Sequence, residues 1–231
     1  QVIAASDLTI VVSEVEVAEL LKEQSDAKIA VVSNIHEVAL NTTGFDDRSG
    51  VMFVGGFQHP PNVDAVEFYA NEIWPLLKER CPNLETYIIG SRMPDSLRKL
   101  GESKGLKMLG FVEDLTPYYE SCKLAIAPLR YGAGVKGKVN QALSYGLPVV
   151  GSPDAFEGMG LTHEREVMVA ETPECFADSV ANVCNNRELW QALSEQGAAS
   201  LVGRFTPEVA EEALRHALAP WLDERDLETI G

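Results

Sequence analysis

The stretch that decides the fold is LAIAPLRYGAGVKGKVNQALSYGLPVV, residues 124–150. It opens with a short apolar run, 124–127, that predicts a buried strand, and it continues into a loop with three glycines. Residues 137–145 then have the pattern of a helix, and 148–150 predict a second strand. A strand, a helix and a strand in this order form a right-handed crossover between parallel strands.

The same alternation extends from this stretch in both directions. We expect further strands at 51–54, 85–89, 107–109 and 167–169, and helices at 62–80, 95–104 and 115–121. Thr172 and Thr206, each followed by Pro and Glu, predict the starts of two more helices. Strands that alternate with helices of this length form a mostly parallel sheet. The predicted fold class is therefore α/β, a Rossmann-like doubly wound parallel sheet with helices on both faces.

A shorter strand-helix-strand unit precedes this sheet. Residues 8–12 and 28–32 predict strands, and Ser13 with Glu16 forms a capping-box pattern that begins a helix ending near Gln24. The polar, glycine-containing stretch NTTGFDDRSG has no periodicity and predicts a linker. The expected organisation is a first segment 1–40, a linker 41–50, a sheet domain 51–219 and a tail 220–231.

Composition narrows the possible partners. The 231 residues include 35 acidic and 19 basic side chains, which gives a formal charge of −16. A nucleic-acid-binding surface needs positive charge, so we expect no nucleic-acid partner. The four cysteines lie far apart without metal-ligand spacing, which favours reduced thiols, no metal site and a cytoplasmic location. The chain begins at Gln1 rather than Met, and we expect it to be a piece of a longer protein.

One segment has the opposite charge. No Asp, Glu or His occurs between Glu120 and Asp154, and the segment has four basic residues, Lys123, Arg130, Lys136 and Lys138. Because salt screens charges over about 8 Å, an anion near this segment would respond mainly to its local positive field.

Within this segment, residues 132–138 read GAGVKGK and join a strand to a helix. Glycines there let backbone N–H groups approach a ligand, and the helix N-terminus favours an anion, so a phosphate or pyrophosphate is the expected ligand. The string also matches two generic motifs, but it comes too late in the sheet for the dinucleotide fingerprint, and Val139 replaces the Ser or Thr of a P-loop. The alternative is a glycine-rich turn with solvated lysines.

Several segments together resemble a known family. They are GG at 55–56, PNVDAV at 61–66, IGSR at 89–92, GFVEDL at 110–115, APLRYGAGVKGK at 127–138 and GLPVV at 146–150. In this order they resemble the donor-binding half of family 4 (group 1) glycosyltransferases, which have the GT-B fold. The resemblance covers about 51–219. Residues 7–13 are similar to the end of the preceding acceptor-side domain, so the chain would be the C-terminal half with that tail.

The resemblance implies a retaining, metal-independent transfer of sugar from a nucleotide-diphosphate sugar to a sugar, lipid or protein acceptor. The resemblance also implies an acceptor-side domain upstream of this chain. It implies no cofactor and identifies no catalytic residue. Any membrane contact would come from parts of the protein outside this chain. This fragment alone would be inactive. The phosphates would contact Lys136, Lys138, Gly134, Val135 and Arg130; the nucleoside would contact Phe111, Val112, Gly90 and Gln141; further donor contacts would come from Gly55, Gly56, His59 and Glu157.

Three positions depart from the family. Gln141 stands where the family has a ribose-binding Glu, Ala133 stands where it has a second Glu, and His59 lies where related enzymes have a basic residue. The neutral amide of Gln141 cannot form the charge-assisted hydrogen bond that a Glu carboxylate would form. Two alternatives therefore stay open: a catalytically degenerate nucleotide-sugar-binding module, and a sugar-nucleotide epimerase with the same fold.

Overall fold

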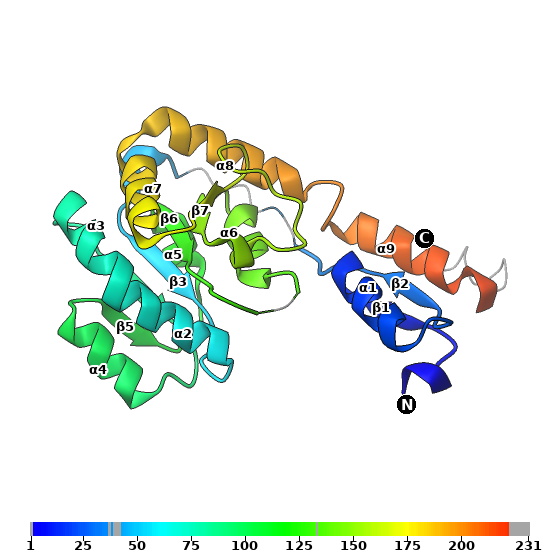
Figure 1. Ribbon diagram of the computed structural model, residues 1–231. Helices are drawn as coiled ribbons and strands as arrows, with labels where there is room; N and C mark the ends of the chain where they lie inside the picture. Colours follow the sequence, from blue (N-terminus) through cyan, green and yellow to red (C-terminus); the bar gives the residue numbers. More distant parts are fainter. Residues whose placement is uncertain (1, 37, 39–42, 133, 222–231) are drawn as a thin grey trace. The chain divides into compact units, whose positions relative to one another are not determined.

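The computed structural model of the protein describes residues 2–36, 38, 43–132 and 134–221 (Figure 1). The chain forms two compact units. The small unit contains residues 1–37 and 201–231, and the large unit contains residues 38–200.

The small unit is built on two parallel strands, β1 (Thr9–Val11) and β2 (Ile29–Val31), joined by helix α1 (Glu14–Glu23). The predicted cap begins this helix: the Ser13 hydroxyl accepts a hydrogen bond from the Glu16 amide, and the Glu16 carboxylate accepts one from the Val12 amide at 2.8 Å. The strand-helix-strand prediction is thus confirmed.

The last helix, α9 (Pro207–Leu218), belongs to the same small unit and packs against β2. The large unit therefore ends at Ser200, before the expected boundary at 219. Short 3-10 turns complete the small unit, η1 (Ile3–Ala5) and η5 (Ala219–Trp221).

The large unit has a six-stranded parallel sheet. Its strands are β3 (Val51–Val54), β4 (Thr86–Ile89), β5 (Lys107–Gly110), β6 (Leu124–Ala127), β7 (Val149–Gly151) and β8 (Met168–Val169), in the spatial order β5-β4-β3-β6-β7-β8. This is the order of a doubly wound sheet, so the predicted fold class is confirmed. The order reverses between β3 and β6, where Val51 pairs with Leu124.

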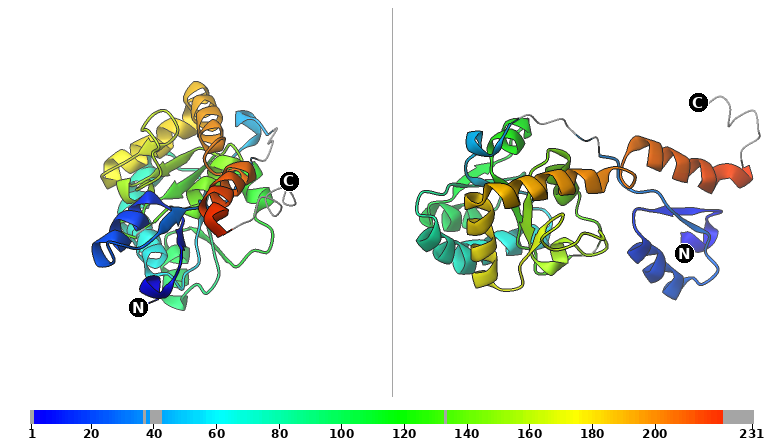
Figure 2. Two further views of the ribbon diagram at one scale, coloured as in Figure 1. Left: turned by 90° about the vertical axis from the view of Figure 1, so that its right-hand side faces the viewer. Right: turned by 90° about the horizontal axis from the view of Figure 1, so that it is seen from above.

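Helices cover both faces of this sheet (Figure 2). They are α2 (Pro60–Phe68), α3 (Trp74–Arg80), α4 (Asp95–Ser103), α5 (Thr116–Ser121), α6 (Gly137–Ser144), α7 (Pro173–Asn185) and α8 (Arg187–Leu201), with the 3-10 turns η2 (Phe45–Asp47) and η4 (Pro153–Ala155). Helix α2 packs against α4, and α3 packs against α7. Helix α6 packs against β6 and β7.

The predicted helix 62–80 is continuous but changes pitch. It begins at Pro60, because a proline fits the first helical position, and it contains a π-helical turn, η3 (Tyr69–Ile73), between α2 and α3. Tyr69 is completely buried there, and its hydroxyl forms a 2.9 Å hydrogen bond with that of Thr86 in β4. This pair satisfies two polar groups inside the core.

The second half of the expected linker is fixed to the large unit. Arg48 is buried, and its guanidinium donates to the carbonyl oxygens of Tyr119 and Cys122 at 2.8 and 2.9 Å. It also lies over the Trp190 ring, 5.3 Å from the centroid. Residues 41 and 42 of this linker lie outside the described part of the chain.

Glycines bring the strand ends together at the carboxyl edge of the sheet. Gly90 follows β4 with φ of +159°, and its amide donates to the Gly110 carbonyl at 2.7 Å. A Cβ atom at this position would lie 1.8 Å from the Gly55 carbonyl oxygen, which is backbone and has little freedom to move. The close approach of these loops therefore requires a glycine at position 90.

We expect Gly90→Ala to lower the free energy of unfolding by roughly 1–3 kcal/mol, because the new methyl group would displace the backbone at Gly55. Urea denaturation measures the change. Gly44→Ala is the matched control, since nothing lies within 4 Å of a Cβ there and its φ is −80°. Equal stabilities of the two variants would contradict the crowded geometry at Gly90.

Candidate functional site

The candidate site lies at the carboxyl edge of the sheet, at the reversal between β3 and β6. Ligands of doubly wound sheets bind at such a reversal, because the loops after the two strands separate there. The loop after β6 leads into α6 at Gly137, so the predicted phosphate-binding segment lies at this reversal.

The half-buried Lys138 side chain contacts residues of β3 and α2. Its ammonium nitrogen lies 4.3 Å from the centroid of the Phe53 ring, in β3, and donates to the side-chain oxygen of Asn62 at 2.5 Å. The side-chain nitrogen of Asn62 in turn donates to the Gly56 carbonyl at 2.8 Å. The ammonium group is thus held between the end of β3 and α2, and it is not the solvated lysine of the alternative interpretation.

This burial changes the acidity of the lysine. Desolvation, together with the smaller effect of the positive charge of Lys136, lowers the pKa of Lys138 to about 7. Near neutral pH the group is divided between its charged and neutral forms. An anion beside it would favour the charged form.

Gly55 makes room for the ammonium group. A Cβ atom at this position would lie 2.9 Å from the Lys138 nitrogen and 2.8 Å from the Asn62 side-chain carbon. Gly55, which was predicted as a donor contact, is therefore also favoured by the packing, since any side chain there would crowd the lysine.

Lys136 folds back onto its own loop. Its ammonium group donates to the carbonyl oxygens of Gly132 and Gly134 at 2.8 and 2.6 Å. Burial lowers its pKa, while the carboxylates of Glu157 and Asp154 oppose that shift. Gly134 has φ of +79°, a conformation that suits glycine. The lysine stabilises the loop, and the exposed Glu157 lies within electrostatic range of it.

Arg130 is already paired. Its Nε and Nη2 atoms donate to the two carboxylate oxygens of Asp64 at 2.9 and 2.5 Å, and the guanidinium lies 4.9 Å from the Phe68 ring centroid. The hydrogen bond with Asp64 raises the pKa of Arg130. Its charge is thus compensated, unlike that of Lys138.

A cavity of about 390 Å³ lies beside Arg130, at the carboxyl ends of β6, β7 and β8. Its lining includes Leu129, Arg130, Ser152, Asp154, Glu171 and Thr172. The space beside Lys138 is much smaller, about 10 Å³, and has room for a single water molecule.

The predicted nucleoside contacts are more dispersed. Phe111 is 73% exposed after β5, and Val112 is half-buried. The amide nitrogen of Gln141 lies 3.4 Å from the hydroxyl of Ser144 on its own helix. Among the hydrogen bonds and ion pairs of the described residues, none joins these three side chains to Lys138.

Other predicted positions lie nearby. His59 is exposed at the start of α2, where its backbone carbonyl accepts from the Asn62 amide at 3.0 Å. Val135 is half-buried in the loop before α6. Ala133 lies outside the described residues.

Asn62 and Phe53 were missed by sequence reasoning. Phe53 reads as an ordinary residue of a buried strand, and nothing in its neighbours distinguishes it. Asn62 carries a weak signal, because it is a polar residue in the first turn of a helix that is otherwise buried on that side. Only the fold brings it next to Lys138, 76 positions later in the chain.

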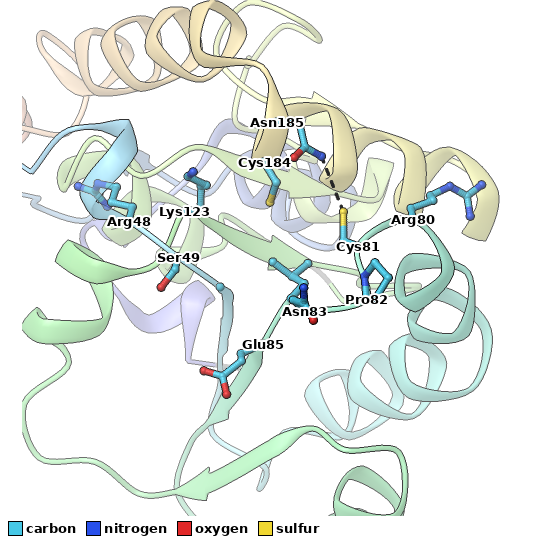
Figure 3. A pocket seen from close by; sticks show the side chains of 12 residues that line it. Arg48, Ser49, Arg80, Cys81, Pro82, Asn83, Glu85, Lys123, Cys184 and Asn185 are labelled. Atoms are coloured by element: carbon cyan, nitrogen blue, oxygen red, sulfur yellow. Dashed lines mark hydrogen bonds between the residues drawn. The ribbon is translucent and has the colours of Figure 1, made fainter.

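A larger pocket lies at the opposite, amino edge of the sheet (Figure 3). Its volume is about 510 Å³, and its lining includes Arg48, Asn83, Glu85, Lys123, Cys184 and Asn185. These residues precede β3, β4 and β6 or end α7. None of the predicted site residues lines this pocket, so it does not belong to the candidate site.

The described part of the chain contains neither a cluster of metal ligands nor a membrane-spanning helix. No group of three or more His, Cys, Asp or Glu side chains is arranged there to hold a metal ion. None of the helices described is long and apolar enough to span a membrane.

The burial of Lys138 predicts how the free energy of unfolding depends on pH. The unfolded chain, in which the pKa of Lys138 keeps its ordinary value of 10.5, binds more protons than the folded chain above about pH 7. Relative to Lys138→Met, the natural chain should therefore gain stability as pH rises from 7 toward 10, by up to about 1.4 kcal/mol per pH unit. Urea denaturation from pH 6 to pH 9 measures this, and parallel curves would contradict the burial.

Comparison with known proteins agrees with this architecture. A family model described as "Glycosyl transferases group 1" matches residues 48–186. A Klebsiella pneumoniae protein described as an uncharacterized 44.6 kDa protein in the cps region is 27% identical over 144 residues, which are 59% of this chain and 37% of that protein.

Solved structures show the same fold. A point mutant of Staphylococcus aureus TarM, solved with fondaparinux, alpha-GlcNAc-glycerol and UDP, has a TM-score of 0.78 at 17% identity, covering 90% of this chain and 43% of TarM. Anabaena HepE, solved with UDP and glucose, has a TM-score of 0.72 at 14% identity, covering 93% of this chain and 63% of HepE. The chain thus spans less than two thirds of these relatives.

The family model covers more than half of the chain, and the six-stranded sheet with its helices matches the Rossmann-like architecture of GT-B glycosyltransferases. The chain therefore belongs to the group 1 glycosyltransferases.

Proposed function

We propose that this chain is the donor-binding part of a retaining, metal-independent glycosyltransferase that transfers a sugar from a nucleotide-diphosphate sugar to an acceptor. The observation that carries the proposal is the Lys138 ammonium group, which lies at the sheet reversal without a carboxylate partner among the described residues. TarM and HepE, which share the fold, were both solved with UDP.

The chemistry of the donor explains why a lysine is useful there. When the sugar leaves, the nucleotide diphosphate gains negative charge, and a fixed ammonium group stabilises that charge more than it stabilises the intact donor. Lys138 would contribute this group. The amides of Gly134 and Val135 and the N-terminus of α6 would add backbone N–H donors.

Lys136 would have a different part in donor binding. Its ammonium group holds two loop carbonyls, so contact with a phosphate would require it to exchange these acceptors. Arg130 would contribute less, because Asp64 compensates its charge. We assign the main phosphate contact to Lys138 for this reason.

A second candidate is a module that binds nucleotide sugars without catalysis. Gln141 favours it, because the family has a Glu at this position and the Gln141 side chain lies near Ser144 of its own helix. Sugar transfer by the complete protein would exclude this candidate. Nucleotide binding with neither transfer nor donor hydrolysis would select it, and an epimerised nucleotide sugar formed without acceptor would select an epimerase.

The acceptor side lies outside this chain in our proposal, which also assigns a cytoplasmic location. We expect the chain to bind the donor nucleotide but to transfer no sugar by itself. A thermal-shift screen with UDP, GDP, ADP and TDP tests the proposal, since a ligand that binds the folded state raises its melting temperature. No shift with any of the four would refute nucleotide-diphosphate binding.

Lys138→Ala should weaken UDP binding by roughly 10- to 150-fold, because it removes a charge-assisted contact of about 1.5–3 kcal/mol. Lys136→Ala should weaken it less, since that ammonium group already has two carbonyl acceptors. Isothermal titration calorimetry measures both. Asn83→Ala, at the opposite edge of the sheet, is the control and should bind UDP as the natural chain does. Equal affinity of all three variants would contradict the assignment.

UDP affinity should also depend on pH. Burial sets the pKa of Lys138 at about 7, so the unliganded protein loses the ammonium charge as pH rises through 7. Affinity should then fall by up to about tenfold per pH unit above pH 7. Calorimetry between pH 7 and pH 9 measures this, with Lys138→Ala expected to show a flat profile. A flat profile in the natural chain would contradict the assignment.

A further inference from the structure

We infer that Asn62 is a positioning residue that holds the Lys138 ammonium group toward the donor phosphates and leaves its charge uncompensated. This inference rests on the proposed function, since it assigns Asn62 a part in the same phosphate site. Three observations support it: the fixed orientation of the amide, the burial of the pair, and the neutrality of the acceptor.

The orientation of the amide is fixed by two contacts. Its nitrogen donates to the Gly56 carbonyl at 2.8 Å, and its oxygen accepts from Lys138 at 2.5 Å. The opposite orientation would place the NH₂ group against an ammonium group and the oxygen against a carbonyl, so that both hydrogen bonds would be lost. Asn62 therefore presents an acceptor, and only an acceptor, to the lysine.

The pair is largely removed from water, with Lys138 itself half-buried. Asn62 is 8% exposed and Phe53 is fully buried. Because an ammonium group has three donors, the single oxygen of Asn62 leaves two of them for a ligand. The position of the nitrogen is then set by one hydrogen bond and one ring contact.

A neutral acceptor preserves the charge of the lysine. Among the described residues, the ionisable groups near Lys138 are Lys136, at the N-cap of the same helix, and Tyr119 of α5, which lines the small cavity with it. Neither is a carboxylate. Arg130, in contrast, is fully paired with Asp64. An aspartate at position 62 would compensate the ammonium charge in the same way and would repel phosphate.

The test compares Asn62→Asp with Asn62→Leu in two measurements. The first is the pH titration of Lys138 in the unliganded protein, followed by NMR of its ε-carbon. The second is calorimetric binding of UDP and of inorganic pyrophosphate. Urea denaturation establishes that each variant folds. Asn62→Asp has nearly the same shape as the natural side chain, so it keeps the test available should Asn62→Leu fail to fold.

We expect Asn62→Asp to raise the titration midpoint of Lys138 and Asn62→Leu to lower it, because they add a negative partner and remove the acceptor. Both variants should bind UDP and pyrophosphate at least about tenfold more weakly, the loss expected for one charge-assisted hydrogen bond. Asn83→Ala, in the pocket of Figure 3, is the control and should change neither measurement.

The outcomes separate this inference from the proposed function. If the natural chain binds UDP and both Asn62 variants bind it equally well, the positioning role is refuted and the proposed function stands. An unchanged Lys138 midpoint in Asn62→Asp also refutes the positioning role. If the natural chain binds none of UDP, GDP, ADP, TDP and pyrophosphate, the proposed function fails, and the inference fails with it.

Discussion

The site depends on one interaction, the hydrogen bond between the buried ammonium group of Lys138 and the neutral amide of Asn62. Placing a positive charge in an apolar environment is unfavourable, and here the Phe53 ring and one oxygen atom compensate only part of that cost. The charge that remains is available to an anion. A protein with a formal charge of −16 thus keeps a localised positive charge at one edge of its sheet.

The backbone makes this interaction possible. The order of the strands reverses between β3 and β6, so α2 and α6 begin on either side of the same gap, and Asn62 and Lys138 approach each other across it. Gly90 allows the loops to come close, and Gly55 leaves room for the ammonium group, since a Cβ atom at either position would crowd its neighbours. The order of the strands and the two glycines therefore determine where the Lys138 ammonium group lies.

The fold could be predicted from sequence because its signals are local. A few neighbouring residues are enough to recognise an apolar run such as Val51–Val54 or a helix cap such as Ser13 or Thr172. Each of these signals is followed by the expected strand or helix in the structure. The residues of the candidate site could be predicted only in part. Lys136 and Lys138 are two positions apart, yet Lys136 binds its own loop, whereas Lys138 contacts Asn62 and Phe53 from distant segments of the chain. Asn62 could not be identified for the same reason.

The crowding at Gly55 also constrains how this site can evolve. A side chain at position 55 would crowd the lysine, whereas a small residue at position 138 would leave space that a side chain at position 55 could fill. The two positions are therefore coupled, and a mutation at one alters which mutations are tolerated at the other. Among relatives of this chain, a larger residue at position 55 should accompany the loss of the lysine, and such pairs would mark lineages that no longer use this charge.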